Sequence, residues 1–210
     1  VHGRVKLCGL TSIEGVSLAA RSGATHAGLI LVPGTPRALE RRWAISLARA
    51  AREHGLKTVG VFRDATPSEV VDGAEALGLD AVQLHGDEDA RVVRADLPSR
   101  VEIWGVSGIG STVGEARPGA DRTLFDTVRD GQSGGSGTAF DWSLIAERGD
   151  LAQSFLAGGI GPSNARAAAQ VGAYGLDVGS SVEASPGVKD PAKVAALFAA
   201  LRPVSRGDGA

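Results

Sequence analysis

Short apolar runs alternate with helical patterns along the whole chain, and this alternation restricts the possible folds more than any other feature. Eight such runs stand near residues 5–10, 26–32, 57–63, 81–86, 102–107, 123–127, 154–159 and 175–181. Several are apolar almost throughout, which is typical of parallel strands buried on both faces. The sequence therefore predicts a repeated strand–helix unit around a parallel sheet.

Helix-start signals stand between these runs. The segments 11–14 (T-S-I-E) and 66–69 (T-P-S-E) each predict a capping box. Asp190-Pro191 opens the last helix with proline at its first position. The weakest patterns lie near 111–117 and 143–148, where we expect the fifth and sixth helices.

The number of units favours a closed barrel. Eight strand–helix units make a (β/α)₈ barrel, although 210 residues is at the low end for that fold. An open doubly wound sheet gives the same alternation, but no G-x-G-x-x-G motif follows the first run. No linker or charge block divides the chain. We therefore expect one barrel domain over residues 1–203 and a flexible tail over 204–210.

Composition excludes several classes of protein. A formal net charge of -2 provides no basic excess for nucleic acid or anionic membrane. No apolar stretch approaches the ~20 residues that cross a bilayer, and no charged-then-apolar leader opens the chain. The single Cys permits no internal disulfide, and the four scattered His form no metal-ligand cluster. We expect a cytoplasmic protein that binds neither nucleic acid nor membrane.

Glycine- and serine-rich segments follow the last three runs. In a barrel, functional groups lie at the carboxyl ends of the strands, and phosphate is often bound by the loops after the last two. Exposed backbone N–H groups, and a helix that we expect to start at Pro162, suit a dianion. Each segment alone could simply make a tight turn, but three adjacent ones favour phosphate. The candidates are Gly135, Ser136, Gly137, Gly158, Gly159, Ser180 and Ser181.

Two residues at the predicted rim suit proton transfer. Cys8 stands where the first strand ends and the first helix begins, although a lone Cys is more often a buried apolar residue. Asp126 lies within an apolar run, where a carboxyl needs a partner or a raised pKa. A rim thiol opposite a rim carboxyl would serve as base and acid. Position alone leaves structural roles open for both.

Other polar residues stand at the same predicted rim. Arg37 could hold a substrate carboxylate through its planar fork, or could be a solvated loop residue. His85 and Asp177 could contact substrate, or could be satisfied within the core. Arg63 and Ser107 end the third and fifth strands and have weaker support.

An ordered set of short motifs runs from about residue 4 to residue 202: K-L-C-G-L-T (6–11), T-P-R (35–37), V-G-V-F (59–62), Q-L-H-G-D-E (83–88), F-D (125–126), G-G-S-G (134–137), F-D-W (140–142), L-A-G-G-I (156–160), G-L-D-V (175–178) and S-S-V-E-A-S-P-G-V-K-D (180–190). Together these motifs resemble the phosphoribosylanthranilate isomerase family. The Phe-Arg ending of the third strand and the run F-D-W-S-L look closest to members fused to indole-glycerol-phosphate synthase.

The resemblance implies a (β/α)₈ barrel and an Amadori rearrangement of N-(5-phosphoribosyl)anthranilate in tryptophan biosynthesis. It implies Cys8 as general base, Asp126 as general acid and Arg37 at the anthranilate carboxylate. It also implies a phosphorylated small-molecule substrate, no cofactor and no metal. A partner is implied too, since the chain would be fused to, or act beside, indole-glycerol-phosphate synthase.

Two alternatives remain open at this point. The first is the histidine-pathway aminoaldose isomerase, or a dual-substrate version of it. It resembles this family in fold, but its halves are alike and it has Asp at the position of Cys8. Here the first strand ends in Cys8 and the fifth in Ser107, so the halves differ. A non-catalytic sugar-phosphate-binding barrel would keep the glycine loops and need neither Cys8 nor Asp126.

Overall fold

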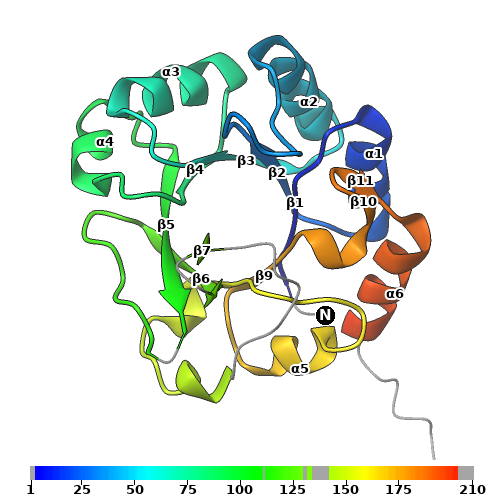
Figure 1. Ribbon diagram of the computed structural model, residues 1–210. Helices are drawn as coiled ribbons and strands as arrows, with labels where there is room; N and C mark the ends of the chain where they lie inside the picture. The colour runs from blue at the N-terminus through cyan, green and yellow to red at the C-terminus, as the bar shows by residue number, and fades with distance from the viewer. Residues whose placement is uncertain (1–2, 111, 130–131, 134–141, 203–210) are drawn as a thin grey trace, which may run out of the picture.

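The eight expected strands are all present and close into a parallel ring. The computed structural model describes residues 3–110, 112–129, 132–133 and 142–202. β1 pairs with both β2 and β9, and β5 pairs with β6, so the sheet closes on itself (Figure 1). The barrel strands are β1 (Val5–Cys8), β2 (His26–Ile30), β3 (Lys57–Phe62), β4 (Ala81–Leu84), β5 (Glu102–Ile109), β6 (Arg122–Arg129), β8 (Phe155–Leu156) and β9 (Gly175–Val178).

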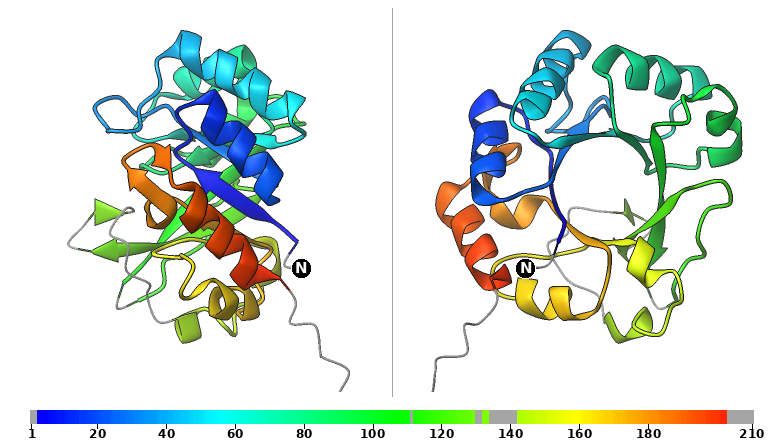
Figure 2. Two further views of the ribbon diagram at one scale, coloured as in Figure 1. Left: turned by 90° about the vertical axis from the view of Figure 1, so that its right-hand side faces the viewer. Right: turned by 180° about the vertical axis from the view of Figure 1, so that it is seen from behind.

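Helices lie outside the ring of strands, as the side and rear views show (Figure 2). The α-helices are α1 (Ile13–Ser22), α2 (Arg41–Glu53), α3 (Pro67–Leu77), α4 (Ala90–Asp96), α5 (Ala165–Gln170) and α6 (Pro191–Leu201). Short 3₁₀ turns are η1 (Trp142–Leu144), η2 (Leu151–Gln153) and η3 (Ser180–Val182). β7 (Gln132–Ser133) pairs with β6, while β10 (Glu183–Ser185) and β11 (Val188–Lys189) form a small hairpin between η3 and α6. None of the helices in the described part of the chain combines the length and apolar character needed to span a bilayer.

Two predicted helix starts, at Thr66 and Asp190, are confirmed, whereas the capping box predicted over 11–14 is wrong. Thr66 and Glu69 form the predicted capping box of α3, and Asp190 caps α6 through the N–H groups of Ala192 and Lys193. In α1 the cap is Ser12, which accepts from the N–H of Gly15. The Thr11 hydroxyl donates instead to the carbonyl oxygen of Gly187, 2.6 Å away, and so fastens the β10–β11 hairpin to the end of β1.

The expected fifth helix is wrong. Between β5 and β6 the described residues form a loop, and the N–H of Gly114 donates to the carbonyl of Gly108 at 3.0 Å. Arg117 lies so close to β5 that a Cβ on Gly105 would come 2.9 Å from Arg117 Cβ. The loop itself therefore covers this part of β5, in the place where a helix was expected. The expected sixth α-helix is also wrong, because only the short turn η1 begins in that stretch.

The barrel interior differs in character along its axis. Its amino-terminal end is filled by aromatic rings, with Trp104 stacked on Phe155 at 4.3 Å and His26 within 5.5 Å of both. Burial, and then the charges of Lys57 and Lys6, lower the pKa of His26 to about 4, so this ring is a neutral packing group near neutral pH. The opposite, carboxyl end of the barrel interior instead holds the polar side chains, as the sequence predicts. The expected tail over 204–210 lies outside the described residues.

Candidate active site

A cavity of about 230 Å³ opens at the carboxyl ends of the strands. Its walls come from strands on all sides of the barrel and from the loops that follow them. Predicted site residues in this lining are Cys8, Arg37, His85, Asp126, Gly158, Gly159, Asp177, Ser180 and Ser181. The other three predicted residues, Gly135, Ser136 and Gly137, lie outside the described part of the chain. Residues as far apart in the sequence as Cys8 and Ser181 thus line one cavity.

Cys8 is the last residue of β1, and its thiol faces the interior beside Gly28 of β2. A Cβ on Gly28 would lie 2.9 Å from the Cys8 Sγ, so only glycine leaves room for the sulfur there. Burial raises the pKa of the Cys8 thiol, whereas the positive charges of Lys6 and Lys189 act to lower it. The thiol is therefore held close to two cations while it lines the cavity.

Asp126 is a buried carboxyl near the end of β6, with 7% of its surface exposed. Its Oδ1 accepts a hydrogen bond from the backbone N–H of Thr127 at 2.8 Å. Burial, and then the negative charge of Asp177, raise the pKa of Asp126 to about 6. A carboxyl with that pKa holds a proton far more readily near neutral pH than an exposed one, which suits a general acid.

His85 stands beside Asp126 at the end of β4. Its Nε2 is 4.0 Å from Asp126 Oδ2, and its Nδ1 is 3.2 Å from the Nε2 of Gln83. Gln83 accepts a hydrogen bond from the Lys6 ammonium through Oε1, so its amide nitrogen is the end that meets His85. That amide donates to Nδ1, and a neutral His85 then carries its proton on Nε2, facing Asp126.

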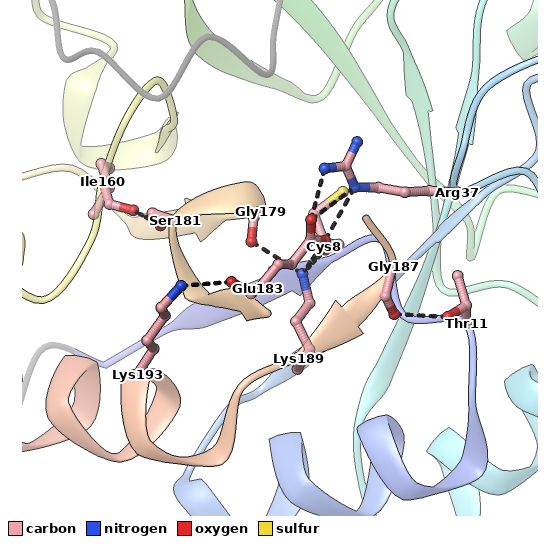
Figure 3. A network of polar contacts seen from close by, with 10 residues as sticks. All are labelled: Cys8, Thr11, Arg37, Ile160, Gly179, Ser181, Glu183, Gly187, Lys189 and Lys193. Atoms are coloured by element: carbon pink, nitrogen blue, oxygen red, sulfur yellow. Dashed lines mark hydrogen bonds and ion pairs between the residues drawn. The ribbon is translucent and has the colours of Figure 1, made fainter. Parts of the chain in front are cut away.

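Arg37 is held in place by the hairpin that follows β9 (Figure 3). Its Nη2 lies 2.6 Å from Glu183 Oε2, and its Nε lies 3.0 Å from Glu183 Oε1. Within the described residues these bonds use two sides of the guanidinium, so Nη1 is the part left to meet a ligand. Burial alone would raise the pKa of Glu183, but hydrogen bonds from Arg37 and Lys189 hold it below its usual value.

Lys189 joins the ends of two neighbouring strands (Figure 3). Its ammonium donates to the carbonyl of Cys8 at 2.6 Å, to the carbonyl of Gly179 at 3.0 Å and to Glu183 at 2.9 Å. Neither Glu183 nor Lys189 is among the site residues predicted from the sequence. Their charges lie next to the predicted Ser180–Ser181 segment, but no local pattern indicates that they turn inward.

The glycine loops after β8 and β9 lie against each other. Gly158 and Gly159 have φ of 83° and 65°, which favour glycine, and the Ser181 hydroxyl donates to the carbonyl of Ile160. The predicted helix start at Pro162 is wrong, because α5 begins at Ala165. Asn164 instead accepts from the N–H of Gly161 at 2.8 Å and donates to the carbonyl of Gly159 at 3.0 Å, so its side chain shapes the loop.

The remaining candidates separate into two groups. Asp177 lines the cavity, and both of its carboxylate oxygens lie 3.0 Å from the Lys6 ammonium. Arg63 also lines it and lies 3.6 Å from Asp64. Ser107 is not in the lining, because side chains alternate along β5 and Trp104 and Val106 take the inward positions. Among the residues described, no cluster of three or more His, Cys, Asp or Glu could hold a metal ion.

A closed eight-stranded barrel, with a cavity lined by ionisable side chains at its carboxyl end, defines the class of (β/α)₈-barrel enzymes. A family model described as N-(5'phosphoribosyl)anthranilate (PRA) isomerase matches residues 5–200. The chain belongs to the phosphoribosylanthranilate isomerase family.

Curated relatives agree with this family but differ in length. The "Tryptophan biosynthesis protein TrpCF" of Yersinia pestis is 43% identical over 206 residues, which cover 95% of this chain and 41% of that protein. The chain thus spans about two fifths of the length of the first such relatives. An "N-(5'-phosphoribosyl)anthranilate isomerase" of Pseudomonas aeruginosa is 39% identical over 203 residues, or 95% of each chain.

Solved structures show the same fold. Phosphoribosyl anthranilate isomerase from Thermus thermophilus superposes with a TM-score of 0.79 at 35% identity, covering 94% of this chain and 98% of the other. A phosphoribosyl anthranilate isomerase in complex with reduced 1-(o-carboxyphenylamino)-1-deoxyribulose 5-phosphate has a TM-score of 0.75 at 28% identity, covering 93% and 96%.

Proposed function

We propose that the chain catalyses the Amadori rearrangement of N-(5-phosphoribosyl)anthranilate to 1-(2-carboxyphenylamino)-1-deoxyribulose 5-phosphate, a step of tryptophan biosynthesis. The observation that carries the proposal is the meeting of Cys8 and Asp126 in one cavity of a chain of this family. The relative with a bound reduced form of that product adds support, because its ligand has a phosphate at one end and a carboxylate at the other.

The two anionic ends of the substrate have separate partners in the cavity. The carboxylate meets Arg37, whose orientation is set by Glu183. The phosphate meets the loops after β8 and β9, at Gly158, Gly159, Ser180 and Ser181, and the G-S-G segment at 135–137 joins them in this proposal. Holding both ends fixes the ribose between acid and base, which removes much of the entropic part of the barrier.

Asp126 acts first, as general acid. Its protonated carboxyl donates to the ring oxygen, the bond from C1 to that oxygen breaks, and the nitrogen lone pair forms an iminium with C1. A pKa of about 6 leaves part of the carboxyl protonated near neutral pH. His85 and Asp177 lie beside Asp126 and complete the surface that meets the sugar.

Cys8 acts second, as general base. Its thiolate removes the proton on C2, which the iminium has acidified, and the electron pair passes to the nitrogen to give an enolamine. Loss of the enol proton and protonation of C1 then give the ketone, so the reaction is a net isomerisation. Because the substrate nitrogen accepts the electron pair, the proposal requires no cofactor and no metal. A positioned acid or base contributes about 10²–10⁴-fold each.

We further propose that the protein works in the cytoplasm, fused to or beside indole-glycerol-phosphate synthase. The length of the TrpCF relatives supports an additional segment, since this chain covers 41% of the one from Yersinia pestis.

A fluorescence assay tests the activity directly. Purified protein is mixed with N-(5-phosphoribosyl)anthranilate, and loss of anthranilate fluorescence is followed beside a parallel reaction with the histidine-pathway aminoaldose. We expect turnover of the first substrate. Binding of a substrate without turnover would indicate a non-catalytic sugar-phosphate-binding barrel. Turnover of the histidine-pathway aminoaldose alone would assign the histidine-pathway reaction. Either outcome contradicts the proposal.

A further inference from the structure

Lys6 is a fully buried cation in the barrel interior, directly below the cavity. Its side chain is 0% exposed, and its ammonium lies 2.8 Å from Gln83 Oε1 and 3.0 Å from both carboxylate oxygens of Asp177. Burying an ion pair costs solvation that an apolar side chain of similar size would not lose. Stability alone therefore does not explain why a lysine occupies this position.

Lys6 and Cys8 share the inward face of β1, because side chains two residues apart in a strand point the same way. A Cβ on Gly28 would lie 2.9 Å from both Cys8 Sγ and Lys6 Cε. Cys8 Sγ and Lys6 Cε thus lie on either side of the position that this Cβ would take. The two atoms are therefore at most twice 2.9 Å apart. The missing side chain at Gly28 is what lets the two groups approach each other.

We propose that Lys6 is a positioning residue that sets the charge state of Cys8, by placing a buried ammonium against the sulfur and so favouring the thiolate. The catalytic consequence rests on the proposed role of Cys8 as base, whereas the effect on the thiol itself does not. Asp177 and Gln83 keep the ammonium in place through the hydrogen bonds that they accept from it.

Other charged groups face Cys8 from the elements around it. Lys189 of β11 donates to the Cys8 carbonyl, and Arg37 and Glu183 lie beside it (Figure 3). Asp177 of β9 opposes the thiolate, while His85, directly after β4, and Asp126 of β6 line the same cavity. Burial has the largest effect on the pKa of the thiol, and Lys6 is the strongest of the groups that lower it. The pKa of Lys6, which burial alone would lower, is raised mainly by the charge of Asp177, so the ammonium stays charged.

The single Cys makes the thiol directly measurable. The rate of carboxamidomethylation by iodoacetamide, an uncharged reagent, is followed from pH 6 to pH 11 in the absence of substrate. Labelling at sulfur can then report Cys8 alone, and the midpoint of its pH profile reports the ionisation of that thiol. The reading does not require that the enzyme be active.

Lys6→Met tests the proposal, and Lys57→Met is its matched control. Lys57 is an exposed lysine at the opposite end of the barrel. The control therefore changes the net charge by the same amount, but at a site far from the sulfur. We expect the Lys6→Met midpoint to rise by about one pH unit or more, with about tenfold slower labelling at pH 7.5, and the Lys57→Met midpoint to stay in place. If Lys6→Met does not fold, Lys6→Gln is used in its place, because its amide can still donate to Asp177. The same rise of the labelling midpoint is expected.

A purely structural role predicts the opposite direction. Loosening the interior would admit water, relieve the burial of the thiol and lower the midpoint towards that of free Cys, about 8.5. A lowered or unchanged midpoint in the folded variant overturns the proposal. Because the pKa of the Cys8 thiol lies above that of Asp126, the alkaline limb of kcat/KM reports Cys8 and should move up by the same amount as the labelling midpoint. A shifted midpoint with an unmoved limb would mean that Lys6 tunes a thiol that is not the base, and would contradict the proposed role of Cys8 instead.

Discussion

Arg37 and Glu183 form a two-point ion pair at the edge of the cavity, with Nη2 2.6 Å from Oε2 and Nε 3.0 Å from Oε1. The pair joins residues 146 positions apart in the chain. It turns a loop arginine, which sequence alone leaves free to be solvated, into a preorganised donor.

Arg37→Ala should mainly weaken substrate binding. We expect KM to rise about 10- to 100-fold, in line with the ~1.5–3 kcal/mol of a charge-assisted hydrogen bond, with a smaller change in kcat. Steady-state kinetics measure both. An unchanged KM would mean that the anthranilate carboxylate binds elsewhere.

Glu183→Gln should act through Arg37. The variant removes the charge that orients the guanidinium, so we expect KM to rise about 3- to 10-fold while the protein stays folded. Glu53→Gln is the control, because it breaks the exposed Arg49–Glu53 pair and should leave KM as it is. Equal kinetics for the two variants would show that the ion pair has no positioning role.

Cys8→Ala and Asp126→Asn should each lower kcat by about 10²-fold or more without unfolding the protein. Both side chains line the cavity. Their loss should therefore affect proton transfer and leave the packing of helices on strands unchanged. Circular dichroism confirms the fold, and the fluorescence assay gives the rate. Turnover close to that of wild type in either variant would refute the acid–base assignment.

Asp126→Asn should also stabilise the protein at neutral pH. Because burial raises the folded-state pKa of Asp126 to about 6, the folded chain binds more protons than the unfolded chain between about pH 4 and pH 6. Stability due to this group therefore falls as pH rises through that window, by about 2–3 kcal/mol. Asn has no such penalty and still accepts from the Thr127 N–H.

Urea unfolding of wild type and Asp126→Asn at pH 4 and pH 7.5 measures this effect. We expect the free energy of unfolding of the variant, relative to wild type, to increase between the two pH values. A relative stability that is independent of pH would mean that the Asp126 carboxyl ionises normally in the folded protein.

Gly158→Ala should damage the proposed phosphate site more than backbone strain alone explains. A Cβ at Gly158 would lie 2.1 Å from Thr127 Oγ1, so the loop must move. Gly55→Ala is the control, because Gly55 also has positive φ, 76°, but a Cβ there meets nothing within 4 Å. We expect about 1 kcal/mol of destabilisation for the control and more for Gly158→Ala.

Inhibition by inorganic phosphate gives the functional part of this comparison. Its Ki should rise at least severalfold in Gly158→Ala and stay at the wild-type value in Gly55→Ala. Equal Ki values in the two variants would argue against phosphate binding by the loop after β8.

Local patterns account for the elements of this fold. Apolar runs mark all eight barrel strands, and capping residues such as Thr66 and Asp190 mark helix starts, because strand burial and cap hydrogen bonds involve near neighbours in the chain. Cys8, His85 and Asp126 could be predicted at the carboxyl end of the barrel in the same way, because each stands at or near the end of a strand.

The tertiary structure alone decided how the interior charges are paired. Lys6 lies in an apolar strand and meets Gln83 and Asp177 across 77 and 171 residues, and Arg37 meets Glu183 in the same way. The loop over β5 replaced an expected helix because Arg117 packs directly on Gly105. Such contacts depend on closure of the barrel, which brings side chains from distant strands together within a common low-dielectric interior, and no periodicity along the chain encodes which of them will touch.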